Sequence, residues 1–222
     1  MDRKNIIGLS ITIVIIALGL LWGLNVLLKN SKTPIVITSG IIPTDVTKNV
    51  TIGNGRSVTT TLIQAENSLS TTPGSVSALN LDLDARTFVT DIGPTVPTAL
   101  VQSLAPNFMV GFYRADIGVW QPFIILKTDS YNNALSGLAA WEPTMANDLA
   151  TLINLGTNSP QPAFQSVAIE NVDVRELDDA SGDPILMYAL PDNQTIVITT
   201  SEAALREIFA RLSPQNFGII KQ

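Results

Sequence analysis

Hydrophobic residues are concentrated in one long run near the start of the chain. Residues 6–28 (IIGLSITIVIIALGLLWGLNVLL) include no charged side chain. As a helix with a rise of ~1.5 Å per residue, this run spans about 34 Å, enough to cross the ~30 Å hydrocarbon core of a bilayer. Trp22 lies near its end, where an amphipathic ring suits the membrane interface. The run predicts a transmembrane helix that contacts the lipid bilayer.

The hydrophobic pattern divides the rest of the chain into a stalk and a folded domain. Residues 29–57 are rich in Thr, Asn, Gly and Pro and show no sustained apolar period, which is typical of a stalk. Periodic apolar positions return beyond it. We therefore expect a tail at 1–5, the transmembrane helix at 6–28, the stalk at 29–57 and one domain at 58–222.

Strands are predicted wherever apolar and polar residues alternate or short apolar runs lie between turns. In residues 77–84 (SALNLDLD), three leucines alternate with Asn and Asp. Two apolar runs at 108–114 and 122–128 flank a turn at 116–118 and predict an antiparallel hairpin. The remaining strands, expected to form a meander, are 166–177, 185–190 and 195–200.

Apolar positions with helical spacing predict a long helix over residues 130–154. Asp129 or Ser130 is expected to cap its start. Pro143 lacks a backbone N–H, so it is expected to kink or split the helix near Trp141.

A second clear helix is predicted near the C-terminus, over residues 203–212, after the possible capping box 199–202 (TTSE). Shorter helices are expected at 58–68 and 97–104. The resulting order β-α-β-β-α-β-β-β-α predicts an α+β fold, with a mostly antiparallel sheet and helices packed on one face. A doubly wound nucleotide-binding fold is disfavoured.

Composition excludes several kinds of chemistry. The chain has no cysteine and no histidine, so Ser-His and Cys-His catalysis and most zinc and haem sites are excluded. Beyond residue 33, nine Lys or Arg residues stand against eighteen Asp or Glu residues, an excess of nine negative charges. This balance repels phosphate backbones, so nucleic acid is not expected as a partner.

The orientation of the anchor is predicted with its N-terminus inside the cell. Arg3 and Lys4 precede the helix, whereas Lys29 and Lys32 follow it, so the positive-inside rule alone gives only a slight preference. A short tail beside a long, cysteine-free domain favours a signal-anchor that exports the domain. A cleaved signal peptide is the main alternative, but no A-x-A site follows the run. The expected location is the cell membrane, with an extracytoplasmic domain.

A prepilin-like leader is a further alternative, because the first eight residues are basic and end in Gly8 before an apolar helix. Type IV pilins usually carry a glutamate five residues after this glycine, where the chain has Ile13. Their helix also continues far beyond the membrane, whereas this one meets Pro34.

The densest group of charges surrounds the loop 178–183 (DDASGD). Its acidic residues are Glu170, Asp173, Glu176, Asp178, Asp179 and Asp183. Oxygen-rich loops with a glycine turn can bind Ca²⁺, but this loop lacks the D-x-D-x-D-G spacing and the distal glutamate. A solvated hairpin turn is expected instead.

Three other carboxylates could serve carbohydrate chemistry. Asp82 and Asp84 would share one face of a strand and could share a cation, although any exposed strand face gives the same spacing. Glu142 beside Trp141, and Arg114 at a strand end, could face a cleft. Such a Trp-Glu-Pro corner more often packs its ring and exposes its acid.

The remaining motifs carry little information. Gly53-Asn54-Gly55 has neither dinucleotide-binding nor P-loop spacing and predicts a turn. Asn49 and Asn193 begin chance matches to the glycosylation pattern. Lys127 could have formed a dyad with Ser130, but a Ser-x-x-Lys pattern is missing. We therefore assign no residue to catalysis, to a cofactor or to a metal.

Part of the chain resembles a group of known sequences. The stretches FMVGFYR, PFIILKTDSYNNALSGLAAWEPTMANDL and DNQTIVITTSEAALREIFARL resemble conserved hypothetical membrane proteins of candidate-phylum bacteria. The resemblance covers about half of the chain and carries no catalytic motif. It implies a location in the bacterial envelope and no particular activity.

The sequence thus predicts a non-enzymatic envelope protein that binds another envelope protein or component. The first alternative is an enzyme that acts on envelope glycans through carboxylates such as Asp82, Asp84 or Glu142. The second is a pilus-like subunit, whose mature chain would begin at Leu9.

Overall fold

The computed structural model describes most of the domain. The described residues are 40–53, 57–66, 68–69, 72–115, 120–152 and 163–212. The expected tail, transmembrane helix and first part of the stalk lie outside them, as does the turn at 116–118. Within these described ranges, every helix is too short or too polar to cross a membrane.

Thirteen elements follow one another along the described part of the chain. They are β1 (Val46–Val50), α2 (Val58–Glu66), β2 (Val76–Leu81), α3 (Ala85–Ile92), α4 (Thr98–Ser103), β3 (Leu104–Arg114), β4 (Trp120–Thr128), α5 (Tyr131–Leu149), β5 (Gln165–Ile169), β6 (Val172–Asp178), β7 (Pro184–Asp192), β8 (Thr195–Thr199) and α6 (Glu202–Leu212).

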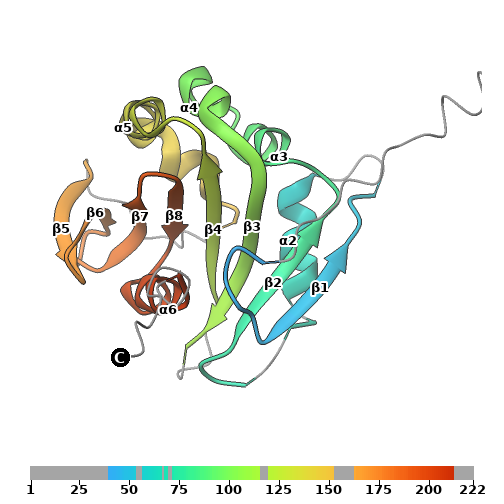
Figure 1. Cartoon of the computed structure of the whole chain (residues 1–222). Helices are drawn as coiled ribbons and strands as arrows, with labels where there is room; N and C mark the ends of the chain where they lie inside the picture. Colours follow the sequence, from blue (N-terminus) through green and yellow to red (C-terminus); the bar gives the residue numbers. More distant parts are fainter. Residues whose placement is uncertain are drawn as a thin grey trace, which may run out of the picture. The chain divides into compact units, whose positions relative to one another are not determined.

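All the described strands form one sheet of eight strands in the order β1-β2-β3-β4-β8-β7-β6-β5 (Figure 1). β1 and β2 are parallel, and every other neighbouring pair is antiparallel. The predicted β3–β4 hairpin and the antiparallel meander that ends in β8 are confirmed. β1 and β5 are the two edge strands.

Both faces of the sheet are covered, so the expectation that all helices pack on one face is wrong. Ile124 and Leu126 of β4 join the core beneath α2, α3, α4 and α5. Ile125, on the opposite face of the same strand, joins a second core that includes Leu205 and Ile208 of α6. Figure 1 shows α3, α4 and α5 together and α6 apart from them. Two packed faces explain why β4 and β8 are apolar without alternation.

The helix α5 runs through Pro143 without a break, so the predicted split does not occur. It ends at Leu149, five residues before the expected end. Its buried face includes Trp141, Met145 and Gly137, and at Gly137 an added Cβ would lie 2.6 Å from Cβ of Leu100. Glycine therefore lets α4 approach α5 closely.

Three segments differ from their predicted assignments. The expected strand 166–177 is two strands, because Glu170 and Asn171 adopt positive φ angles of 51° and 63° in a tight turn between β5 and β6. Part of the expected stalk belongs to the domain, since it supplies β1 and the buried Ile42, which is 1% exposed. Helix α3 was not predicted, although Asp84 caps it.

The capping of α6 also differs from the prediction. Ser201 Oγ accepts a hydrogen bond from the N–H of Ala204 at 3.1 Å, as an N-cap does. Thr199, the first residue of the expected capping box, instead donates its hydroxyl to the carbonyl of Pro122 at 2.9 Å. It remains in the last position of β8.

Candidate functional site

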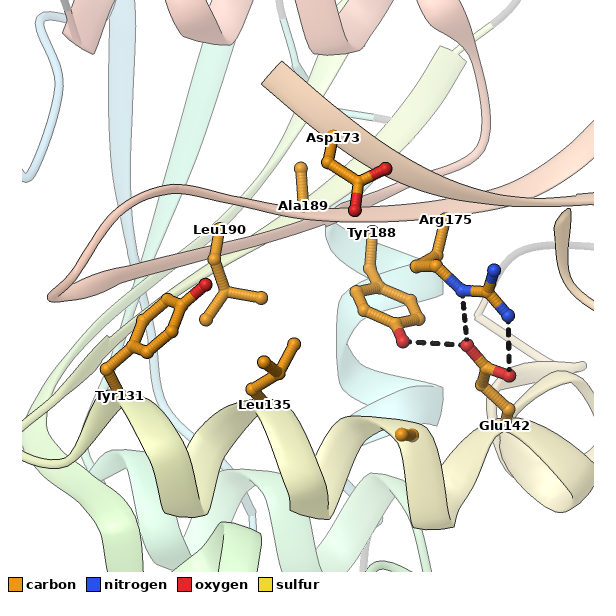
Figure 2. A pocket seen from close by; sticks show the side chains of 9 residues that line it. Tyr131, Leu135, Glu142, Asp173, Arg175, Tyr188, Ala189 and Leu190 are labelled. Carbon is orange, nitrogen blue, oxygen red and sulfur yellow. Dashed lines mark hydrogen bonds and ion pairs between the residues drawn. The ribbon is translucent and has the colours of Figure 1, made fainter. Parts of the chain in front are cut away.

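A pocket of 220 Å³ lies between α5 and the strands β6 and β7. Its walls combine apolar, aromatic and charged groups (Figure 2). The lining residues are Tyr131, Leu135, Ala139, Glu142, Asp173, Arg175, Tyr188, Ala189 and Leu190. This mixture can orient a ligand by polar contacts and hold it by apolar contacts.

The strand side of the pocket follows from the alternation of side chains along β6. Asp173 and Arg175 are two residues apart, so both project from the face that is covered by α5. Arg175 lies directly opposite Tyr188 in the antiparallel pairing of β6 with β7. Glu142 reaches the same point from α5, and Figure 2 shows the three side chains meeting.

Glu142 accepts three hydrogen bonds. Arg175 Nε donates to Oε1 at 2.8 Å and Arg175 Nη2 donates to Oε2 at 3.0 Å, which makes the ion pair bidentate. The hydroxyl of the buried Tyr188 donates to Oε1 at 2.7 Å. Arg175 also donates to Ser166 Oγ at 3.0 Å and to the carbonyl of Phe164 at 3.1 Å. The cluster therefore links α5 to three segments of the sheet region.

The protonation states in this cluster are fixed at neutral pH. Burial raises the pKa of Glu142, but the hydrogen bonds from Arg175 and Tyr188 and the charge of Arg175 outweigh it, so the pKa lies below the ordinary value. Burial, and then the hydrogen bond to Glu142, raises the pKa of Tyr188. Glu142 stays ionised and Tyr188 stays protonated. Neither group is poised for proton transfer, because an effective general acid or base needs a pKa near the working pH.

The mouth of the pocket is less constrained. Tyr131 and Leu135, four residues apart on α5, are 37% and 41% exposed. Asp173 is exposed and, among the described residues, its carboxylate makes no hydrogen bond or ion pair. This half of the pocket therefore offers an unpaired carboxylate next to apolar surface.

Replacing Glu142 with glutamine should lower the free energy of unfolding at pH 7 by about 1–2 kcal/mol, because a neutral amide satisfies Arg175 and Tyr188 poorly. The folded pKa of Glu142 lies below its ordinary value of 4.5. The contribution of Glu142 to the free energy of unfolding is thus complete above pH 4.5 and is lost as the pH falls through the folded pKa. Urea unfolding at neutral and acidic pH should show the difference between wild type and Glu142→Gln shrinking in acid. A difference that does not depend on pH would contradict this role.

The carboxylates proposed for carbohydrate chemistry do not meet. Asp84 is the N-cap of α3, where its Oδ1 accepts the N–H of Thr87 at 2.8 Å. Neither it nor Asp82 lies on a strand, because β2 ends at Leu81, so the expected shared strand face is wrong. The pocket that contains Glu142 is lined by neither of them.

Arg114 and Lys127 also lie outside this pocket. The guanidinium of Arg114 stacks 4.9 Å from the ring centroid of Trp120. Lys127 Nζ donates to Thr195 Oγ1 at 2.6 Å, across the β4–β8 pair, and not to Ser130. Both residues therefore have contacts that hold strands together.

The acidic loop after β6 is organised by its own backbone. Asp179 is buried, and its Oδ1 accepts the N–H groups of Ser181 at 2.8 Å and Asp183 at 3.0 Å. These bonds close the turn between β6 and β7. Among the described residues, no three acidic side chains converge in an arrangement that could hold a metal ion. Glu170, at the other end of β6, pairs with Arg206 at 3.2 Å.

Glu176 should destabilise the fold at neutral pH. Its burial, together with the nearby charge of Asp178, raises the pKa of Glu176 above the ordinary 4.5. An acid with a raised folded pKa favours folding below its unfolded pKa, and this contribution is lost as the pH rises through the folded pKa. Glu176→Gln should therefore raise the free energy of unfolding at pH 7 by roughly 0.5 kcal/mol and leave it unchanged in acid.

The control for Glu176→Gln is Asp82→Asn, which removes one charge from an exposed residue whose carboxylate makes no hydrogen bond or ion pair among the described residues. Urea unfolding at both pH values measures the two variants. If Asp82→Asn stabilised the protein as much as Glu176→Gln, the cause would be the change in net charge and not the position of Glu176.

The other motifs are structural or lie outside the described residues. Asn49 lies on β1 and its Oδ1 accepts Asn80 Nδ2 at 3.1 Å. Asn193 lies in the exposed turn between β7 and β8. Gly53 is described, but the two residues that follow it in the Gly-Asn-Gly motif are not.

Sequence reasoning singled out Glu142 but did not find Arg175 or Tyr188. The partners are 33 and 46 residues away from Glu142 in the chain, so no local spacing joins them. A weak signal existed in Asp173 and Arg175, which alternate with apolar residues in β6 and share one strand face.

We found no protein-family model that matches the chain. A search of curated proteins also gave no similar sequence.

Proposed function

We propose that this protein is a single-pass membrane protein of the bacterial envelope whose exported α+β domain is a non-enzymatic binding module. The uncharged apolar run 6–28 supports the anchor. The resemblance to conserved hypothetical membrane proteins of candidate-phylum bacteria supports the location. The pocket between α5, β6 and β7 supports the binding role.

The main support for the binding role is that the polar groups Glu142, Arg175 and Tyr188 in this pocket are hydrogen-bonded to one another. Glu142 is bound by Arg175 and Tyr188, and its pKa is lowered. Catalytic acids and bases are more often groups whose environment moves the pKa toward neutrality. A cluster whose polar groups are already paired, beside exposed apolar side chains, suits recognition better than proton transfer.

The glycan-cleaving alternative has less support. Glycoside hydrolysis uses two carboxyl groups across one bond, of which the general acid has a raised pKa. Asp84 is engaged in capping α3, and Glu142 has a lowered pKa. These positions therefore do not supply the required pair.

The exported location can be tested with single cysteines, because the natural chain has none. Ser181→Cys places a thiol in the exposed turn between β6 and β7, and Asp2→Cys places one in the expected tail. Sealed spheroplasts are treated with a membrane-impermeant maleimide before and after permeabilisation. We expect labelling at 181 before permeabilisation and at 2 only afterwards. The reverse pattern would place the domain in the cytoplasm and overturn the envelope function.

The same preparation distinguishes the pilus-like alternative. A mature chain that begins at Leu9 would indicate removal of a leader after Gly8. The mass of the intact protein measures this directly. We expect a mass that includes residues 1–8.

A further inference from the structure

The pocket beside α5 has one charge that is not neutralised within the described structure. Glu142 and Arg175 form a bidentate pair and cancel each other. The carboxylate of Asp173, which lines the same pocket, makes no hydrogen bond or ion pair among the described residues. The surplus charge at the mouth of the pocket is therefore negative.

Arg175 does not offer a binding site for an anion that would offset the negative charge of Asp173. Nε and one Nη2 N–H bind Glu142, one Nη1 N–H binds Ser166, and one Nη2 N–H binds the carbonyl of Phe164. Four of the five N–H donors of a guanidinium are thus occupied. An anionic ligand would meet Asp173 without gaining a free cation.

The opposite wall supplies apolar surface to the same pocket. Tyr131 and Leu135 project from α5, Leu190 faces them from β7, and Asp173 lies on the strand side (Figure 2). Long cationic side chains bury their methylene stems on such surface while the charged end reaches a carboxylate.

We propose that this pocket binds a lysine or arginine side chain of a partner protein. The inference rests on the proposed binding function and names the chemistry of its ligand. A protein partner is favoured over a small amine because the exposed Tyr131 and Leu135 widen the contact surface beside the charge. Aromatic residues and arginine are enriched at the centres of protein interfaces. The acidic excess of the chain, six negative charges, attracts a basic partner at longer range.

The experiment uses the full-length protein in nanodiscs of zwitterionic lipid, so that a cationic probe does not bind the bilayer. Leucine methyl groups are isotopically labelled and followed by NMR. The probes are Nα-acetyl-lysine amide, Nα-acetyl-norleucine amide, which has the stem without the charge, and glucosamine. We expect the lysine probe to shift the methyl signals of Leu135 and Leu190, with about fivefold tighter binding than the norleucine probe.

Two matched variants assign the effect to the carboxylate. Asp173→Asn should weaken binding of the lysine probe about fivefold, whereas Asp82→Asn, which removes a charge outside the pocket, should leave it within about twofold of wild type. Equal binding of the lysine and norleucine probes would overturn the proposal. So would tighter binding of glucosamine, which would indicate an amino sugar, or the absence of methyl shifts with all probes.

The experiments distinguish a failure of the lysine-binding proposal from a failure of the proposed function. Labelling at position 181 before permeabilisation, without any preference for lysine, would retain the envelope binding module and reject this ligand. A preference for lysine in a domain that labels only after permeabilisation would retain the pocket chemistry and reject the exported location.

Discussion

Replacing Trp141 with alanine should lower the free energy of unfolding by about 3–5 kcal/mol, the usual loss for a buried tryptophan. Trp141 is 1% exposed, and its Nε1 donates to Asp148 Oδ2 at 2.7 Å. The same carboxylate oxygen accepts the hydroxyl of Thr95 at 2.6 Å, so the indole helps to fix the loop between α3 and α4 on α5. The variant removes the ring and one partner of Asp148 together. Urea unfolding of the purified protein measures the loss.

Trp141→Phe separates these two contributions. It keeps an aromatic ring but not the N–H donor, so we expect a loss of about 1–2 kcal/mol. Equal stability of the alanine variant and the wild type would contradict the central position of Trp141 in the core.

Replacing Gly111 with alanine should cost about 3 kcal/mol, the upper part of the usual range for overpacking. A Cβ at this position would lie 2.2 Å from the backbone oxygen of Ser77 on β2 and 2.6 Å from the ring of Phe123 on β4. Backbone atoms of a central sheet cannot move aside independently, so β2 and β3 would have to separate. The midpoint of urea unfolding reports this effect.

Gly182→Ala is the matched control for Gly111→Ala. Gly182 has a positive φ of 87°, and an added Cβ there would meet no atom within 4 Å. Only the backbone strain of a non-glycine residue remains, roughly 1–2 kcal/mol. A larger loss at Gly182 than at Gly111 would show that close packing of β3 is not the constraint.

Much of the fold follows from local patterns that the sequence displays. The hairpin of β3 and β4 and the meander that ends in β8 were predicted from apolar runs between turns. Helix α3 was missed even though its buried residues, Ala85, Phe88, Val89 and Ile92, have helical spacing behind Asp84. Asp84 was instead placed on an exposed strand face, because the predicted strand was extended past Leu81. The helical spacing was visible in the sequence, but the alternation of apolar and polar residues just before it, in residues 77–84, favoured a strand.

Other features depend on contacts that no local pattern contains. β1 is short and polar, and only its parallel pairing with β2 makes it part of the sheet. The placement of α6 on the second face could have been inferred, because uninterrupted apolar runs such as Phe123–Leu126 indicate strands that are covered on both faces. The cluster of Glu142, Arg175 and Tyr188 could not have been inferred from the sequence, because it joins a helix to two strands far along the chain.

The most direct measurement is photo-crosslinking in intact cells from a photoreactive amino acid at position 135, in the wall of the pocket. The matched control position is Ile63, which is 38% exposed on α2, away from the pocket lining. We expect a discrete protein adduct at 135 that is absent at 63, lost in Asp173→Asn and retained in Asp82→Asn. Adducts at both positions, or an adduct at 135 that persists in Asp173→Asn, would contradict recognition of a basic partner through this pocket.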